Sequence, residues 1–155
     1  MKIYLDADAA PVAVKEILYR AVNRCRIPLV MVANQAMKVP DSKLISFIIV
    51  AAGPDEADHK IAELVEPGDL VITADIPLAD RVVTAKGFAL NPRGDFYTED
   101  NIKGRLAVRD LMAELRNQEI ITKGPAPFSS RDKQEFGNKL DQFLTKYLKS
   151  KKKEG

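Results

Sequence analysis

The stretch Leu29–Ala33 (Leu-Val-Met-Val-Ala) is an unbroken apolar run between Pro28 and the polar residues that begin at Asn34. Strands that are buried on both faces have such continuous runs, whereas strands with one face in water alternate apolar and polar residues. Sheets that are buried on both faces are mostly parallel and are covered by helices. The run therefore predicts a parallel sheet in an α/β fold.

Strands and helices alternate on both sides of this run. Upstream, a strand over 2–5 precedes a helix that begins at Pro11, whose missing N–H suits a first helical turn, and that ends near Cys25. Downstream, we expect strands over 44–50, 69–73 and 88–90, with helices over 55–65 and 77–85. This alternation predicts right-handed βαβ crossovers and a three-layer α/β/α domain, in which a sheet of about five strands is mostly parallel.

The rest of the chain is predicted to be helical and to belong to the same domain. One helix is expected over 98–118, and another starts at Ser129, where Asp132 three places on forms an imperfect capping box. The length of 155 residues is near the usual size of one domain. Residues 1–148 are thus predicted to form a single α/β domain, and 149–155 a flexible basic tail.

Composition decides little about partners. The 24 Lys and Arg residues against 22 Asp and Glu give a formal charge of +2, which by itself indicates neither nucleic acid nor a membrane. No apolar run reaches the roughly 18 residues of a membrane-spanning helix, and no signal peptide is recognisable, so we expect a cytoplasmic protein without a membrane partner. The single Cys25 is expected to be a buried, unreactive thiol. The oligomeric state stays open.

Carboxylates follow three of the predicted strands. Asp6 and Asp8 follow the first strand, Asp55 and Asp58 the third, and Asp75 the fourth. The carboxyl ends of parallel strands meet at one edge of the sheet, where ligands bind. Crowded carboxylates repel one another, and Mg²⁺ or Mn²⁺, which prefer oxygen ligands, would neutralise them. The implied reaction is metal-assisted phosphoryl chemistry.

A helix cap is the simplest alternative for these aspartates. Asp8, Asp55 and Asp75 each stand where a carboxylate could accept backbone N–H bonds at the start of a helix. One helix needs only one cap, however. Capping therefore accounts for one residue of the pair Asp6 and Asp8 and leaves the other carboxylate without a structural role. For the set as a whole, the pattern favours a functional site.

A phosphatase is a weaker alternative. An Asp-x-Asp pair after a first strand also occurs in haloacid-dehalogenase-type phosphatases, in which the first Asp is a nucleophile. Thr73 could supply the hydroxyl group that this chemistry needs and Lys86 the positive charge. No acidic pair for Mg²⁺ follows these two residues, however.

Five segments and one further residue, in order along nearly the whole chain, together resemble the bacterial YaiI/YqxD family. They are residues 6–12 (Asp-Ala-Asp-Ala-Ala-Pro-Val), 53–58 (Gly-Pro-Asp-Glu-Ala-Asp), 68–79 (Gly-Asp-Leu-Val-Ile-Thr-Ala-Asp-Ile-Pro-Leu-Ala), 91–94 (Asn-Pro-Arg-Gly), 124–128 (Gly-Pro-Ala-Pro-Phe) and Asp132. The family looks like a relative of the PIN-like nucleases, metal-dependent phosphodiesterases with acidic residues at the carboxyl ends of a parallel sheet.

The resemblance implies metal-ligand roles for Asp6, Asp8, Asp58 and Asp75, with Asp6, Asp8 and Asp75 as the catalytic residues. Asp55 is then a helix cap or lies just behind the ligands. The implied cofactor is Mg²⁺ or Mn²⁺, and the implied partner is RNA or DNA.

Two positions depart from the patterns that this resemblance brings. Ala10 stands where the family usually has Cys, so a thiol at this position cannot be essential to whatever the chain does. PIN-like nucleases also typically include a glutamate among their ligands, and Glu56 is not well placed to supply it. The aspartates remain the candidate ligands.

Basic residues are concentrated after the last predicted strand. They are Arg93, Lys103, Arg105, Arg109, Arg116, Lys123, Arg131 and Lys133. They could form a phosphate-binding rim beside the acidic site or simply solvated helix faces. Arg93 and Arg109 are the predicted substrate-binding residues. His59 is expected to be exposed, and Phe96, Tyr97 and Phe128 to pack in the core rather than to stack on bases.

The first functional hypothesis is a Mg²⁺- or Mn²⁺-dependent nuclease that hydrolyses phosphodiester bonds, with RNA as the expected substrate. The second is a non-catalytic nucleic-acid-binding or nucleotide-binding module that keeps the acidic pocket. Metal binding alone would not distinguish the two, since both retain the carboxylates.

Overall fold

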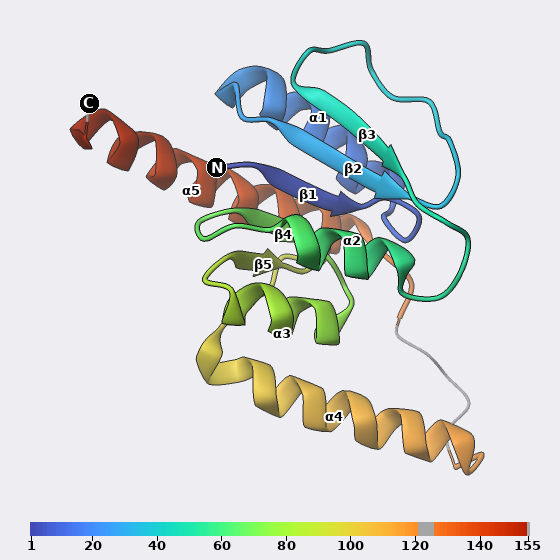
Figure 1. Ribbon diagram of the computed structural model, residues 1–155. Coiled ribbons are helices and arrows are strands. Elements are labelled where there is room, and N and C mark those ends of the chain that lie inside the picture. The colour runs from blue at the N-terminus through green and yellow to red at the C-terminus, as the bar shows by residue number, and fades with distance from the viewer. Residues whose placement is uncertain (121–125, 155) are drawn as a thin grey trace.

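The computed structural model describes residues 1–120 and 126–154, and it consists of a six-stranded sheet between helical layers (Figure 1). The strands are β1 (Ile3–Asp6), β2 (Leu29–Ala33), β3 (Ile45–Ile49), β4 (Leu70–Ile72), β5 (Phe88–Leu90) and β6 (Phe96–Tyr97). Their spatial order is β3-β2-β1-β4-β5-β6, and every neighbouring pair is parallel except β5 and β6. The predicted three-layer α/β/α fold with a mostly parallel sheet is confirmed.

Helices cover both faces of this sheet. They are α1 (Val12–Cys25), α2 (Glu56–Leu64), α3 (Ile76–Thr84), α4 (Glu99–Asn117) and α5 (Ser130–Glu154). Helices α1 and α5 pack together on one face, while α2 and α3 pack together on the other, and α4 lies against the outside of α3. None of the described helices combines the length and the apolar character that crossing a membrane requires.

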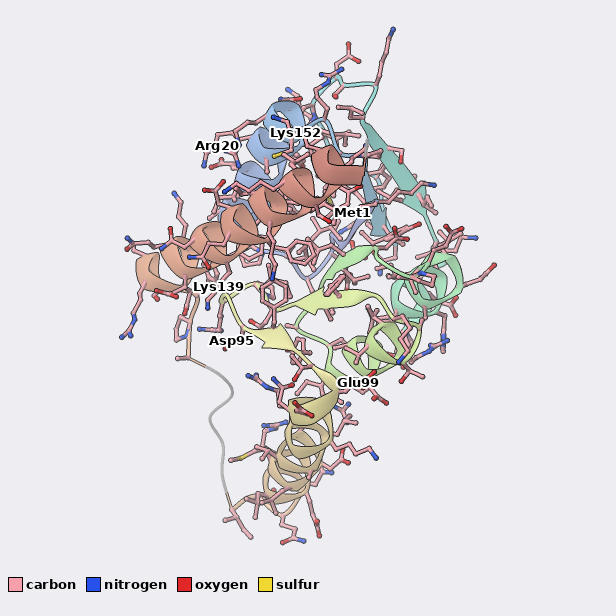
Figure 2. The ribbon with its side chains drawn as sticks, turned by 90° about the vertical axis from the view of Figure 1, so that its left-hand side faces the viewer. Met1, Arg20, Asp95, Glu99, Lys139 and Lys152 are labelled. Atoms are coloured by element: carbon pink, nitrogen blue, oxygen red, sulfur yellow. The ribbon has the colours of Figure 1, made fainter. Side chains whose placement is uncertain are left out.

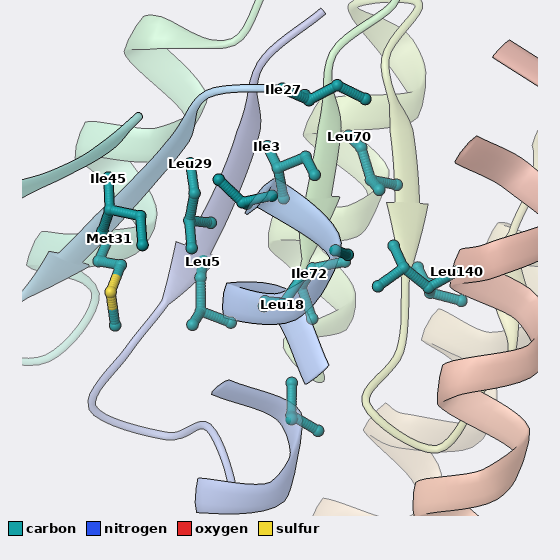
Figure 3. Packing of buried hydrophobic residues seen from close by; sticks show 14 of the residues in the cluster. Ile3, Leu5, Leu18, Ile27, Leu29, Met31, Ile45, Leu70, Ile72 and Leu140 are labelled. Carbon is teal, nitrogen blue, oxygen red and sulfur yellow. The ribbon is translucent and has the colours of Figure 1, made fainter. Parts of the chain in front are cut away.

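The core is divided by the sheet into two apolar clusters, because successive side chains of a strand point to opposite faces. In β1, Ile3 and Leu5 pack towards α1 and α5, whereas Tyr4 packs towards α2 and α3. Figure 3 shows the first cluster, in which Leu18 of α1 and Leu140 of α5 lie over the strand residues. Because both faces are covered, β1 and β2 consist mostly of buried residues, as the continuous apolar run predicts.

The strand order fixes where a ligand would bind. The chain runs from β1 outwards to β2 and β3, and then returns to place β4 on the other side of β1. The neighbouring strands β1 and β4 thus continue into crossovers on opposite sides, which opens a crevice beyond their carboxyl ends. The arrows of β1 and β2 point to the right in Figure 1, so this crevice lies on that side of the molecule.

Two features of the carboxyl-terminal third differ from the sequence predictions. A short strand, β6, pairs antiparallel with β5 after a tight turn at Gly94, and its two residues were too few to give a periodic pattern. Helix α5 continues to Glu154, so Lys149, Lys151 and Lys152 prolong the helix instead of forming the predicted flexible tail. Lys123 and the start of the Gly-Pro-Ala-Pro-Phe segment lie outside the described residues.

Candidate metal centre

Three aspartates meet at the carboxyl edge of the sheet. Asp55, Asp58 and Asp75 each offer a carboxylate oxygen, and these oxygens all lie within 4.8 Å of one another. Asp55 immediately precedes α2, Asp58 lies in its first turn, and Asp75 immediately precedes α3. The positive ends of two helix dipoles therefore face the cluster and partly offset the repulsion among its charges.

Asp75 is the N-cap of α3. Its Oδ1 accepts a hydrogen bond of 2.8 Å from the N–H of Leu78, and its own N–H donates to Oγ1 of Thr73 at 2.9 Å. The cap interpretation is therefore confirmed for Asp75. Because a carboxylate has two oxygens with several lone pairs, Asp75 can cap the helix and still offer an oxygen to a cation.

The cap interpretation is wrong for Asp55 and Asp8. Asp55 occupies the N-cap position of α2 in a left-handed conformation, with a φ of 67°, but its side chain makes no capping bond. Asp8 is not at the N-cap of α1, a position that Pro11 takes. Oδ2 of Asp8 instead accepts a hydrogen bond of 2.7 Å from the N–H of Asn34, which ties the loop after β1 to the end of β2.

Asp58 is the most perturbed carboxyl group of the cluster. Burial, followed by the negative charges of Asp75 and Asp6, raises the pKa of Asp58 to about 7. Its Oδ1 is buried and has no hydrogen-bond partner among the residues that the structure describes. A buried acceptor without a partner is costly, and a cation with oxygen preference would satisfy it.

Asp6 lies at the end of β1, beside this cluster. Burial raises the pKa of Asp6 above its ordinary value, and the charges of Asp8 and Asp75 raise it further. Asp6 and Asp8 also line a cavity of about 240 Å³ together with Asp55 and Asp58. The predicted ligands Asp6, Asp58 and Asp75 are thus brought together, Asp55 joins them, and Asp8 lies at the border of the group.

The residues present fit a Mg²⁺ or Mn²⁺ ion. The donors are carboxylate oxygens, which these hard cations prefer, and one of the three residues, Asp58, has a buried Oδ1 without a partner among the described residues. A neighbouring cavity of about 260 Å³ lies at the crevice between β1 and β4, lined by Asp6, Asp75, Thr73 and Pro92 among others. The arrangement can therefore hold a cation and leaves space beside it for a substrate.

Two arginines stand beside the carboxylates. Arg81 of α3 and Arg109 of α4 line a cavity of about 160 Å³ together with Asp55, Asp58 and Asp75. The guanidinium of Arg109 also donates to its neighbour Asp110, at 3.0 Å. Arg109 therefore lies beside the candidate ligands, and its role in substrate binding stays a prediction.

Arg81 was missed by the sequence interpretation. It lies on α3 with its Nη1 3.1 Å from Nδ1 of the exposed His59 on α2. The pattern of α3 marks Arg81 only as an exposed helix residue. Its approach to the carboxylates follows from the packing of α2 against α3, which no local signal indicates.

Arg93 does not extend towards the carboxylates. Its guanidinium donates to Oδ2 of Asp132 at 2.7 Å and also to the carbonyl oxygen of Ala126. These bonds join the turn after β5 to the start of α5. The structure therefore gives Arg93 a role in holding the fold, and its predicted role in substrate binding gains no support.

The phosphatase alternative gains no support from Lys86. This residue precedes β5 and lies at the amino edge of the sheet, opposite the aspartates, where its ammonium group contacts Glu99 at 2.9 Å. Thr73 does lie near the cluster, but it is buried and its hydroxyl oxygen accepts the N–H of Asp75. The hydroxyl group of Thr73 and the ammonium group of Lys86, which a phosphatase would need together, are therefore at opposite edges of the sheet.

Comparison with known proteins adds the family. The sequence matches the family described as the uncharacterized YaiI/YqxD family over residues 4–146. The chain belongs to the YaiI/YqxD family. This confirms the resemblance seen in the sequence, and the YaiI/YqxD match includes all the segments and the residue, Asp132, on which that resemblance rested.

Relatives of high identity cover almost the whole chain. A UPF0178 protein of Maridesulfovibrio salexigens is 55% identical over 96% of this chain and 98% of its own length. UPF0178 proteins of Syntrophotalea carbinolica and Aeromonas hydrophila are 52% and 54% identical, over 96% and 93% of this chain and 100% and 96% of their own lengths. No solved structure matches the chain. These YaiI/YqxD relatives carry names that state no activity, so the relation to PIN-like nucleases stays a prediction.

Proposed function

We propose that this chain is a Mg²⁺- or Mn²⁺-dependent nuclease that hydrolyses phosphodiester bonds of RNA. The observation that carries the proposal is the state of Asp58, whose buried Oδ1 has no partner among the described residues, while Asp55 and Asp75 each bring an oxygen close to the Asp58 carboxylate. A purely structural carboxylate would be paired with a donor. A carboxylate that binds a cation is expected to have an oxygen without a protein donor and other carboxylates close by.

The side chains divide the work of the proposed reaction. Asp55, Asp58 and Asp75 hold the ion, with Asp6 beside them at the end of β1. When bound, the ion would polarise the phosphoryl group and lower the pKa of a water molecule. Arg81 and Arg109 line the same cavity as the three aspartates, where their guanidinium groups can offset the charge of the scissile phosphate.

The same geometry also supports a phosphodiester substrate. In one cavity at the carboxyl edge, Arg81 and Arg109 line the same space as the carboxylates, and two neighbouring cavities share Asp58 or Asp75 with it. A substrate phosphate can thus reach the metal ligands and the arginines together. In proteins, Mg²⁺ commonly completes its coordination shell with water and with phosphate oxygens of the substrate.

Isothermal titration with Mn²⁺ tests the metal centre. Wild type is expected to bind the ion at a single site, and Asp58→Asn to weaken binding about 100-fold, because the neutral amide removes one charged ligand. Asp41→Asn makes the same change of charge at an exposed residue outside the cluster and should bind like wild type. An absence of binding to the wild-type protein would rule out the metal centre.

Cleavage of end-labelled single-stranded RNA and DNA tests the activity. With Mn²⁺ we expect cleavage of RNA that is abolished by EDTA and by Asp58→Asn, and that survives in Asp41→Asn. Cleavage of DNA alone would correct the substrate. If the ion binds but neither strand is cut over a range of sequences, the non-catalytic binding module is the better description.

A further inference from the structure

A cavity of about 520 Å³ opens at the amino edge of the sheet, opposite the aspartates. It lies between β5, β6 and α5, and we refer to it as the aromatic cavity. The side chains that characterise it are Phe88, Phe96, Tyr97, Phe143, Lys146 and Tyr147. Its volume is within the range of small-molecule sites, which are mostly apolar and carry a few polar groups.

Three of the aromatic rings that line the cavity, those of Phe88, Phe96 and Phe143, form one connected group. Phe143 of α5 contacts Phe88 edge-on, with ring centroids 5.0 Å apart, and contacts Phe96 at 5.5 Å. Phe88 is 45% exposed, so contact with Phe143 leaves a large part of its ring uncovered. Ring faces and edges are therefore offered to a further planar group, with which such rings interact favourably.

The polar groups of the cavity are cationic or neutral. Lys146 and Ser150 follow Phe143 on the same face of α5, and Thr98 lies at the end of β6. Among the described residues that line this cavity, none is Asp or Glu. The ammonium group of Lys146 thus favours an occupant with a negative charge beside its planar ring.

We propose that the aromatic cavity binds a planar aromatic anion, with the ring against Phe88, Phe96 and Phe143 and the acidic group beside Lys146. The proposal is independent of the metal centre, because the two sites share no residue and lie at opposite edges of the sheet. This ligand chemistry has two sources. One is a free aromatic carboxylate or phosphate, and the other is a base of a nucleic-acid strand together with its phosphate. Titrations in EDTA separate the two sources without interference from any nuclease activity.

The probes are 1-naphthoate, its neutral counterpart 1-naphthalenemethanol, adenosine 5′-monophosphate and a single-stranded tetranucleotide. We expect 1-naphthoate and the mononucleotide to bind wild type with one-to-one stoichiometry, and the neutral compound to bind several-fold more weakly. Tetranucleotide binding at least as tight as that of the mononucleotide would identify a strand as the source. Its failure to bind would identify a free molecule, and both results support the shared chemistry.

Two pairs of variants localise the binding. Ser150→Trp fills the cavity from an exposed helix residue and should abolish binding, whereas Thr145→Trp, at an exposed residue outside the cavity lining, should not. Lys146→Glu should weaken naphthoate binding about five- to tenfold, the effect of a charge in a partly exposed site. Lys139→Glu is the matched control. Lys139 lies on the same helix but outside the cavity lining, on the side away from Lys152, which marks the carboxyl end of α5 in Figure 2. Circular dichroism confirms that each variant is folded.

Several results would overturn the proposal. They are an absence of saturable binding of 1-naphthoate and the mononucleotide to wild type, unchanged binding in Ser150→Trp, and equal weakening by Lys146→Glu and Lys139→Glu. Sedimentation velocity supplies a further test. A wild-type dimer that Ser150→Trp converts to a monomer would assign the cavity to contact with a second copy of the chain.

Discussion

The guanidinium of Arg93 donates a hydrogen bond of 2.7 Å to Oδ2 of Asp132, which links the turn after β5 to the first turn of α5. The same Oδ2 accepts the N–H of Ser129 at 3.0 Å, and Oγ of Ser129 in turn accepts the N–H of Asp132. The hydrogen bonds from Ser129 and the charge of Arg93 hold the pKa of Asp132 below its ordinary value. The capping box expected from the sequence is thus confirmed, and an arginine completes it.

Arg93→Ala is expected to destabilise the fold without affecting metal binding. The substitution removes the donors to Asp132 and to the carbonyl oxygen of Ala126, and so loosens α5 from the sheet. Urea unfolding should show a lower midpoint, while Mn²⁺ titration should be unchanged. Arg109→Ala is the control, because the side chain of Arg109 is half exposed and its one ion pair among the described residues is with its sequence neighbour Asp110. Equal midpoints for the two variants would contradict the structural role of Arg93.

Gly94→Ala is expected to cost about 2–4 kcal/mol of folding free energy, since overpacking adds to backbone strain. Gly94 has a φ of 97°, and a Cβ there would lie 2.8 Å from the backbone of Glu135 in α5. Gly104→Ala supplies the contrast, because the middle of α4 has open space at this position. That change should stabilise by about 0.5–1 kcal/mol through helix propensity. Urea unfolding of both variants measures the difference, and a neutral Gly94→Ala would contradict the close packing.

The stability of the metal-free protein is expected to fall as the pH rises from about 4 to 7. The carboxyl group of Asp58 has an ordinary pKa when the chain is unfolded but one of about 7 when it is folded. The native state therefore binds more protons in this interval, and stability is lost as the proton leaves. We expect about 1–2 kcal/mol after allowing for solvent screening at this partly exposed group.

Thermal unfolding in EDTA at pH 5 and pH 8 measures this effect. Asp58→Asn should flatten the dependence on pH, because the amide does not titrate, whereas Asp41→Asn should keep the slope of wild type. A wild-type protein equally stable at both pH values would show that Asp58 is not held in a perturbed environment.

Asp75→Asn and Asp75→Ala separate the two roles of this residue. Asparagine is a good N-cap but lacks the charge, so Asp75→Asn should keep the stability of metal-free wild type and lose most of the stabilisation by Mn²⁺. For wild type, that stabilisation is about 2.7 kcal/mol when the free ion is about 100 times Kd. Asp75→Ala should in addition lose about 1 kcal/mol with the cap. Unfolding with Mn²⁺ and with EDTA decides, and full Mn²⁺ stabilisation of Asp75→Asn would remove this residue from the ligands.

Asp8→Asn is expected to weaken Mn²⁺ binding much less than Asp58→Asn. Oδ2 of Asp8 already accepts the N–H of Asn34, and Asp8 lies outside the three aspartates whose oxygens converge. Its charge still acts on Asp6, so a small loss of affinity is expected. Titration calorimetry of both variants gives the comparison. Equal losses would restore Asp8 as a direct ligand.

The sequence by itself determined the layers of this fold and the edge at which its aspartates gather. A continuous apolar run such as Leu29–Ala33, a proline near a helix start, and Ser129 three residues before Asp132 act over a few positions. Such local signals predict strands and helix starts without knowledge of the rest of the chain, because they depend on backbone geometry and on burial of a strand's two faces.

Only the tertiary structure decided which side chains share the site. Asp55 comes close to Asp75, and Arg81 to His59, because α2 and α3 pack side by side over the sheet. Arg93 instead contacts Asp132 of α5, nearly forty residues later in the chain, and so does not extend towards the aspartates. Distances between oxygens depend on contacts between remote segments, and periodicity and capping patterns carry no information about those contacts. The pattern of aspartates therefore indicated a candidate metal centre in outline, and the packing of α2 against α3 selected the three aspartates whose oxygens converge.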